Sequence, residues 1–337
     1  MMKLFNRRTF IKRTALGLFS STGGVGYLEH LSKLTNNPII KTINEKSKVA
    51  IIRGEERADN VIEALKIFEN DIKRRIENKK VIIKPNFVST RRQLSATNVE
   101  NIEGILDFFK PIYKERIIIA ESPAIGNVEE GYQNYDYNRL TRKYNVELKD
   151  IDREDSDIVY IIDRNIHPLP IRVSKMLLDD DSYIISPAIL KTHDAVVVTL
   201  SLKNIVMGAP LISDRNYKSM VHQGIKGTNY NLFLLAQKMP PDLAIIDGVE
   251  GMEGNGPVSG KPVKVGVTIA STDFLAADRV AVEVMKVDFN KIGYLNYCAT
   301  AKMGNADIDN IEIIGEKIEN CAKKFKLHYN VESQLKW

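Results

Sequence analysis

The sequence has few cysteines, few turn-forming residues and no long apolar run, and each absence excludes a class of protein. Two cysteines among 337 residues cannot build a disulfide framework, a four-cysteine zinc site or an iron–sulfur cluster. No eighteen consecutive residues are apolar, so no standard transmembrane helix is predicted. With 20 glycines and 12 prolines, the chain is also not of low complexity. A hydrophobic content of 44% and a charged content of 27% are typical of a folded globular protein.

The formal charge of +5 is confined to the first 40 residues. These carry six basic side chains and one acidic side chain, which leaves 42 basic and 42 acidic residues in the rest of the chain. A neutral body lacks the excess of lysine and arginine that nucleic acid or an anionic membrane surface selects. We therefore expect no nucleic-acid partner, and membrane contact only through the N-terminal segment if that segment is not cleaved.

Residues 6–12 read Asn-Arg-Arg-Thr-Phe-Ile-Lys and precede a mildly apolar stretch that ends near Leu28. This pattern resembles a twin-arginine export signal, which we assign to residues 1–40; a basic amphipathic helix is the alternative. The resemblance implies the twin-arginine translocation machinery as a partner. It also implies a location in the periplasm or on the outer face of the cytoplasmic membrane. That pathway exports folded proteins, which often take up a metal or an organic cofactor first.

The periodicity of apolar residues predicts an α/β fold over residues 46–317. Strand-like and helix-like segments alternate, which favours a mostly parallel sheet with flanking helices. We expect a single compact body, with a division into two lobes left open, and a polar C-terminal tail over residues 318–337. The first predicted strands are Lys48–Arg53, Lys80–Lys84 and Arg116–Ala120, and the helices between them are Ala58–Glu77 and Asn98–Tyr113.

The second half of the chain predicts further strands, two of which end in polar loops. The strands are Tyr183–Ser186, Ala195–Leu202, Leu243–Ile246 and Val263–Ala270. The polar loops are residues 187–194 and the glycine-rich residues 247–260. Because parallel sheets bind ligands at the carboxyl ends of their strands, we expect a site where these loops meet.

Histidine and lysine dominate the candidate site residues. A neutral imidazole can pass a proton or ligate a metal near neutral pH, and ammonium groups can hold an anion. We predict that His193, His222 and Lys203 are catalytic; the alternative is that each histidine is structural or solvated. The residues predicted to bind a small anionic substrate are Lys84, Asn86, Lys191, Asn204 and Asn255.

The glycine-rich loop also carries three acids, Asp247, Glu250 and Glu253. Oxygen ligands at this density suit a hard cation such as Mg²⁺, so we predict them as candidate metal ligands. A loop that contacts a ligand directly and a structural turn are the alternatives. The sequence contains no GxGxxG after the first strand, no phosphate-binding GxxxxGK[ST] and no GxSxG elbow, so nucleotide binding and serine hydrolysis are not predicted.

Several stretches together are similar to the family catalogued as domain of unknown function 362. They are VIIKPNFV (81–88), SPAILKTHDAVVVTLSLKNIVMGAP (186–210), DLAIIDGVEGMEGNGPVSG (242–260) and STDFLAADRVAVEVM (271–285). The resemblance implies the fold and the position of the site rather than a reaction. Many relatives carry a ferredoxin-like module with repeated Cys-x-x-Cys, which this chain lacks, so no iron–sulfur cluster is implied here.

A more distant similarity is to the nickel-pincer lactate racemase family. His193, Lys203 and His222 follow the order of a histidine, a cofactor-holding lysine and a second histidine in that family. The similarity implies a histidine that removes a proton from a 2-hydroxy acid while a hydride moves to the cofactor. The glycine pair before the lysine is replaced here by Ser201-Leu202, which puts the pincer cofactor in doubt.

Two functions therefore stay open. The first is an exported enzyme that acts on a small anionic substrate with a metal or bound cofactor, by isomerase- or racemase-like or oxidoreductase chemistry. The second is a non-catalytic extracytoplasmic protein that binds a ligand or a metal. Neither the reaction nor the identity of a cofactor follows from the sequence.

Overall fold

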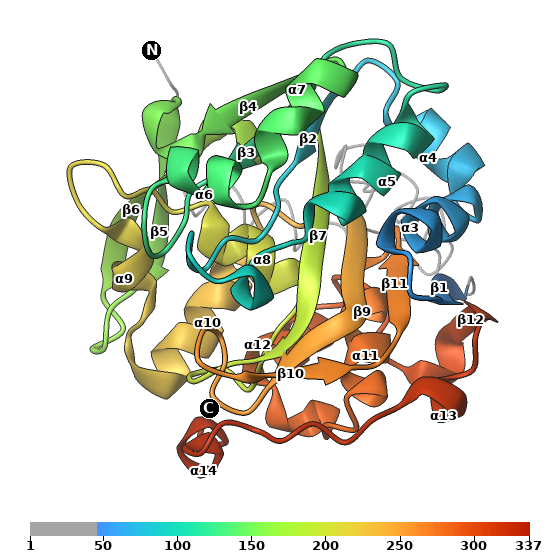
Figure 1. Ribbon diagram of the computed structural model, residues 1–337. Helices are drawn as coiled ribbons and strands as arrows, with labels where there is room; N and C mark the ends of the chain where they lie inside the picture. The colour runs from blue at the N-terminus through green and yellow to red at the C-terminus, as the bar shows by residue number, and fades with distance from the viewer. Residues whose placement is uncertain (1–45) are drawn as a thin grey trace, which may run out of the picture. The chain divides into compact units, whose positions relative to one another are not determined.

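A ten-stranded sheet forms the centre of the computed structural model, which describes residues 46–337 (Figure 1). Its main path has the order β12-β1-β11-β9-β7-β2-β3-β4, and β10 and β8 pair with β9 and β7. The strands are β1 (Ser47–Arg53), β2 (Lys80–Ile83), β3 (Ile117–Glu121), β4 (Val146–Asp150), β7 (Ser182–Thr192), β8 (Val198–Thr199), β9 (Leu243–Glu253), β10 (Lys261–Lys264), β11 (Val267–Ser271) and β12 (Ile311–Gly315).

Five neighbouring strands run in the same direction. β9, β7, β2, β3 and β4 are parallel, β1 is parallel to β12, and β11 is antiparallel to both β1 and β9. The predicted α/β class with a mostly parallel sheet is therefore confirmed. A separate antiparallel pair, β5 (Ser156–Ile162) and β6 (Pro168–Ser174), lies outside this sheet.

Helices cover both faces of the sheet, and the strands supply alternate side chains to the two resulting cores. Within β2, Ile82 belongs to one core and Val81 and Ile83 to the other, as the two-residue period of a strand requires. One face packs against α3 (Arg57–Lys66), α4 (Glu69–Arg75), α5 (Val99–Phe109), α6 (Val128–Asn134) and α7 (Leu140–Lys143). The other packs against α8 (Ser201–Gly208), α10 (Gly224–Ala236), α11 (Phe274–Val284) and α12 (Gly293–Thr300) (Figure 1).

The predicted strand Ala195–Leu202 is wrong, because most of it is a bend and the start of the helix that carries Lys203. Only Val198 and Thr199 pair as a strand, β8, and α8 begins at Ser201. The buried Asp278 carboxylate accepts hydrogen bonds from the backbone of Ser201 and Leu202 at 2.9 and 3.1 Å, which satisfies the first N–H groups of the helix. This cap comes from a distant helix, so local apolar periodicity does not reveal it.

Two strands are longer than their apolar runs suggest. β7 continues to Thr192 and β9 to Glu253, so residues predicted to lie in loops pair with each other, as Ile189 does with Asp247. Lys191, Thr192 and Asp247 in these extensions are buried and held by neighbouring elements, which permits a strand where the sequence reads as a loop. As a result, Asp247 lies inside a strand and not at its end.

The last twenty residues pack against the body. They include α13 (Ile318–Cys321) and α14 (Val331–Gln334), and residues 46–337 form one compact unit. Phe325 and Gln334 are buried. No helix within residues 46–337 has both the length and the apolarity that a membrane span needs. The predicted export signal at residues 1–40 lies outside the described residues.

Candidate functional site

Three of the predicted site residues are buried lysines that come from different elements. Lys84 follows β2, Lys191 lies in β7 and Lys203 lies in α8, and their exposed fractions are 1%, 0% and 5%. A buried ammonium group is stable only when its three protons find acceptors and its charge finds a counter-charge. The three lysines differ in their hydrogen-bond acceptors and in their counter-charges. We use this difference to distinguish a structural lysine from a candidate functional one.

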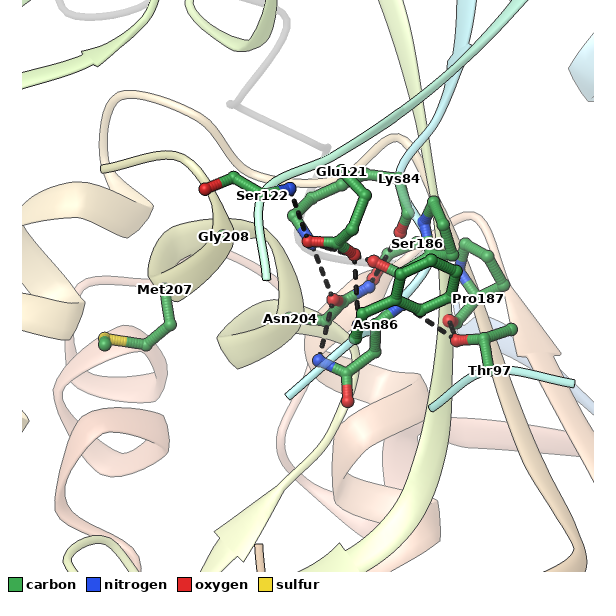
Figure 2. Close-up of polar contacts among 12 residues, drawn as sticks. Lys84, Asn86, Thr97, Glu121, Ser122, Ser186, Pro187, Asn204, Met207 and Gly208 are labelled. Atoms are coloured by element: carbon green, nitrogen blue, oxygen red, sulfur yellow. Dashed lines mark hydrogen bonds and ion pairs between the residues drawn. The ribbon is translucent and has the colours of Figure 1, made fainter. Parts of the chain in front are cut away.

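Lys84 is fully partnered (Figure 2). Its Nζ contacts both carboxylate oxygens of Glu121 at 3.0 and 2.9 Å, the Pro85 carbonyl at 2.8 Å and Asn204 Oδ1 at 3.1 Å. Burial lowers the pKa of Lys84, and the Glu121 charge opposes that shift. Four acceptors use the whole donor capacity of an ammonium group, so the geometry favours a structural role over the predicted contact with an anion.

Glycine at the end of α8 makes room for this lysine. A Cβ atom on Gly208 would lie 1.7 Å from Lys84 Cε, so any larger residue would displace the lysine (Figure 2). On the other side, Lys218 Nζ donates to the Gly208 carbonyl at 2.8 Å and closes the C-terminal end of the helix. Burial and the nearby charge of Lys84 lower the pKa of Lys218 to about 7. Lys218 is not among the predicted site residues, because no local sequence pattern distinguishes it from other lysines.

Two asparagines connect Lys84 to the second lysine. Asn204 Oδ1 accepts from Lys84 and from Asn86 Nδ2 at 3.1 Å, while its Nδ2 donates to the Lys84 carbonyl and to Ser186 Oγ. Asn86 Oδ1 accepts from Lys191 Nζ at 2.5 Å. Four of the five predicted substrate-binding residues thus lie in one buried network, with both amides oriented by lysines.

Lys191 has no carboxylate partner among the described residues. Its Nζ donates to Asn86 Oδ1 and to the Ser95 carbonyl at 3.2 Å, which leaves one proton without an acceptor from residues 46–337. Burial and the neighbouring charge of Lys203 hold the pKa of Lys191 well below its usual range. An anion near this group would restore its ammonium form.

Lys203 and His193, two of the three predicted catalytic residues, contact each other. Lys203 Nζ lies 3.0 Å from His193 Nε2, and both side chains are buried. Burial and the Lys203 charge lower the pKa of His193 far below its usual value, so the imidazole is neutral at pH 7. Burial lowers the pKa of Lys203 to about 8. Within residues 46–337, the imidazole is the one hydrogen-bond partner of Lys203, so two lysine protons can reach a ligand.

His222 and Asn255 lie near this pair without a hydrogen bond to it. His222 follows α9 (Tyr217–Val221) and is exposed; partial desolvation and the Lys203 charge lower its pKa. Asn255 is exposed in the turn after β9. The turn lies against the residue before His193, because a Cβ on Gly256 would be 2.1 Å from the Thr192 carbonyl oxygen. Both predicted residues therefore belong to the surroundings of the pair.

The three predicted metal ligands do not come together. Asp247 accepts from Arg57 Nε at 2.9 Å and Asn101 Nδ2 at 2.8 Å, on the α3 and α5 face of the sheet. Glu253 accepts from the Lys326 backbone at 2.9 Å, and Glu250 is exposed. Among residues 46–337, no three His, Cys, Asp or Glu side chains are placed to hold a metal ion. The described residues thus give the metal hypothesis no support.

The proteins to which this chain is similar include a curated relative and two solved structures. A thylakoid-associated protein of Synechocystis sp. is 26% identical over 215 residues, which cover 62% of this chain and 64% of the relative. The lactate racemase apoprotein of Thermoanaerobacterium thermosaccharolyticum aligns with a TM-score of 0.45 and 13% identity, over 73% of this chain and 58% of that one. A Thermotoga maritima protein aligns with a TM-score of 0.38 and 11% identity, over 69% and 60%.

The chain spans less than two thirds of the length of each of these proteins. Residues 81–283 match the family described as Domain of unknown function (DUF362), and they include Lys84, Lys191, His193 and Lys203. Because the match extends over more than half of the chain, the protein belongs to the domain of unknown function 362 family.

Proposed function

We propose that this chain is an enzyme that transfers a proton on a small anionic substrate, with His193 as the base. Lys203 and Lys191 hold the anion, and Asn86 orients Lys191. The observation that supports this proposal most directly is the buried contact of 3.0 Å between Lys203 Nζ and His193 Nε2, with no carboxylate partner for Lys203 among the described residues.

The electrostatics of the pair favour an anionic substrate. A negative charge between Lys203 and Lys191 favours the ammonium form of both groups and draws Lys203 away from His193 Nε2. The Nε2 lone pair is then available to remove a proton from the substrate, and the imidazole is already neutral at pH 7. Return of the proton to the other face of the same carbon would be racemisation.

The donor set fits an anionic organic group better than a metal ion. One histidine and two lysines present nitrogen donors and positive charge, whereas the carboxylates of Asp247 and Glu253 are engaged elsewhere. A negatively charged cofactor would bind to the same lysines as the substrate. No step of this proposal passes through a metal.

A solvent-exchange experiment tests the proposal without knowledge of the substrate. Protein purified from its own host is incubated in D₂O with a mixture of 2-oxo acids, 2-amino acids and 2-hydroxy acids, and deuterium incorporation is followed by mass spectrometry. We expect incorporation into one class, reduced by about 10²–10⁴-fold in His193→Ala, the usual contribution of a general base. The unfolding free energy of this variant should fall by no more than about 1–2 kcal/mol.

A non-catalytic anion-binding protein is the second candidate, because the same lysines support binding alone. Native mass spectrometry of the wild type, Lys203→Met and the exposed-lysine control Lys110→Met separates the two functions. An anion retained by the wild type and by the control, lost in Lys203→Met and never deuterated, would favour the binding protein. A wild type that neither retains an anion nor exchanges a proton would contradict both.

Export is part of the same proposal and rests on the sequence alone. The segment from Asn6 to Lys12 carries the paired arginines, and the excess positive charge is confined to residues 1–40. The double substitution of Arg7 and Arg8 by lysine should retain the protein in the cytoplasm, as judged by fractionation. Unchanged export of that variant would contradict the assignment.

A further inference from the structure

The two ring nitrogens of His193 have different partners. Nε2 faces Lys203 Nζ at 3.0 Å. Nδ1 accepts a hydrogen bond from the backbone N–H of Ala195 at 3.0 Å, and Asp194 Oδ1 lies 3.1 Å from the same nitrogen as an ion-pair contact. A neutral imidazole has one N–H and one acceptor nitrogen. Nδ1 can therefore accept from Ala195 or donate to Asp194, but it cannot do both at once.

The choice at Nδ1 depends on the protonation state of Lys203. When Lys203 is an ammonium group it donates to Nε2, so the ring proton lies on Nδ1 and points to Asp194. When Lys203 is an amine, Nε2–H can donate to the amine lone pair, and Nδ1 then accepts from Ala195. Each tautomer of His193 thus matches one protonation state of Lys203.

The same three side chains lead from the interior to solvent. Lys203 and His193 are 5% and 4% exposed, whereas the Asp194 side chain is 53% exposed. The charges that face the pair come from several elements. Lys191 of β7, His222 after α9 and His328 of the C-terminal segment disfavour a cationic His193, and Asp194 favours a cationic Lys203.

The C-terminal segment fixes the turn that carries Asp194. Asn330 Nδ2 donates to the Asp194 carbonyl at 3.0 Å, and Gln334 Oε1 accepts from the Val197 backbone at 2.6 Å. Val197 has a φ of +68° in the left-handed region, and its carbonyl accepts from the His193 backbone at 2.8 Å. These bonds hold the backbone of the turn that carries Asp194.

We propose that Asp194 is a positioning residue that makes His193 a proton relay between buried Lys203 and solvent. Lys203 gives a proton to Nε2, and Nδ1 gives its proton to the Asp194 carboxylate, which releases it to water. The net change is one ammonium proton moved to solvent, with no oxidant or co-reactant. The relay is a property of the protein without substrate. Its use in catalysis, which is to remove from His193 the proton taken from the substrate, rests on the proposed function.

Ring ¹⁵N chemical shifts of histidine-labelled protein test the relay, because they distinguish the two tautomers. In the wild type we expect His193 to carry its proton on Nδ1 below the pH at which Lys203 loses its own, and on Nε2 above it. In Asp194→Ala the midpoint should move down by about one pH unit or more, since an opposite charge is removed. Asp194→Asn, which keeps an acceptor oxygen, should retain the Nδ1–H tautomer at low pH and shift the midpoint in the same direction.

The pair of His167 and Asp163 supplies a matched control. His167 Nδ1 lies 3.3 Å from Asp163 Oδ2, and His167 is exposed. Asp163→Ala should leave the His193 signals unchanged. A His193 tautomer and midpoint that are the same in Asp194→Ala and wild type would overturn the relay, even if His193-dependent deuterium exchange supports the enzyme. Conversely, the expected shifts without any turnover would support the relay and leave the enzyme contradicted.

Discussion

Lys84 packs against α8 and Lys203 belongs to it, and both are almost fully buried. Their partners nevertheless differ. Lys84 meets both oxygens of Glu121, whereas Lys203 meets a neutral imidazole. An ion pair offsets the desolvation of a buried charge, and an imidazole offsets much less of it. Burial alone therefore does not distinguish a functional lysine from a structural one. The distinguishing feature of Lys203 is that it lacks a carboxylate partner among the described residues.

The largest effect should follow from removal of the counter-charge of Lys84. Glu121→Gln leaves a buried ammonium group without its partner and should lower the unfolding free energy by about 3–5 kcal/mol. Lys203→Met removes a buried charge that has no carboxylate partner in the described residues and should cost no more than about 1–2 kcal/mol. Urea unfolding at pH 7 measures both. Equal costs for the two variants would remove the distinction between the lysines.

The pH dependence of stability should reveal the second lysine. The pKa of Lys203 is about 8 in the folded protein and 10.5 in the reference state, so between these values the unfolded chain binds the additional proton. The stability of the wild type relative to Lys203→Met should therefore rise by up to about 3 kcal/mol as the pH increases from 8 to 10.5, and should be constant below that range. Denaturant titrations at several pH values test this. A flat difference would mean that Lys203 keeps its proton when folded.

A smaller effect should follow from crowding Lys84 without a change of charge. Gly208→Ala places a methyl group against the lysine stem, and such overpacking typically costs about 1–3 kcal/mol. We expect the His193 ring signals to keep their wild-type pH midpoint in this variant. The added methyl group disturbs Lys84, which already has all its hydrogen-bond acceptors, and not Lys203. A shift of that midpoint would show that the two lysines act as one unit.

The sequence was informative where local patterns sufficed. Alternating strands and amphipathic helices predicted the α/β class, and two of the predicted catalytic residues, His193 and Lys203, lie within hydrogen-bond distance. It was misleading where polar residues are buried. Asp247 read as the start of a loop because a carboxylate inside a strand is unusual, and only the contacts with Arg57 and Asn101 explain its position.

Composition and periodicity by themselves determined the fold class, the neutral charge of the body and the residue types available for chemistry. Tertiary structure alone decided which lysine has a counter-charge. Glu121 reaches Lys84 because β2 and β3 are parallel neighbours, and the backbone of the turn after His193 is fixed by a C-terminal segment more than 130 residues away. The sequence gives the charge of each side chain. Whether an opposite charge lies close enough to neutralise it depends on distances between segments that only folding brings together.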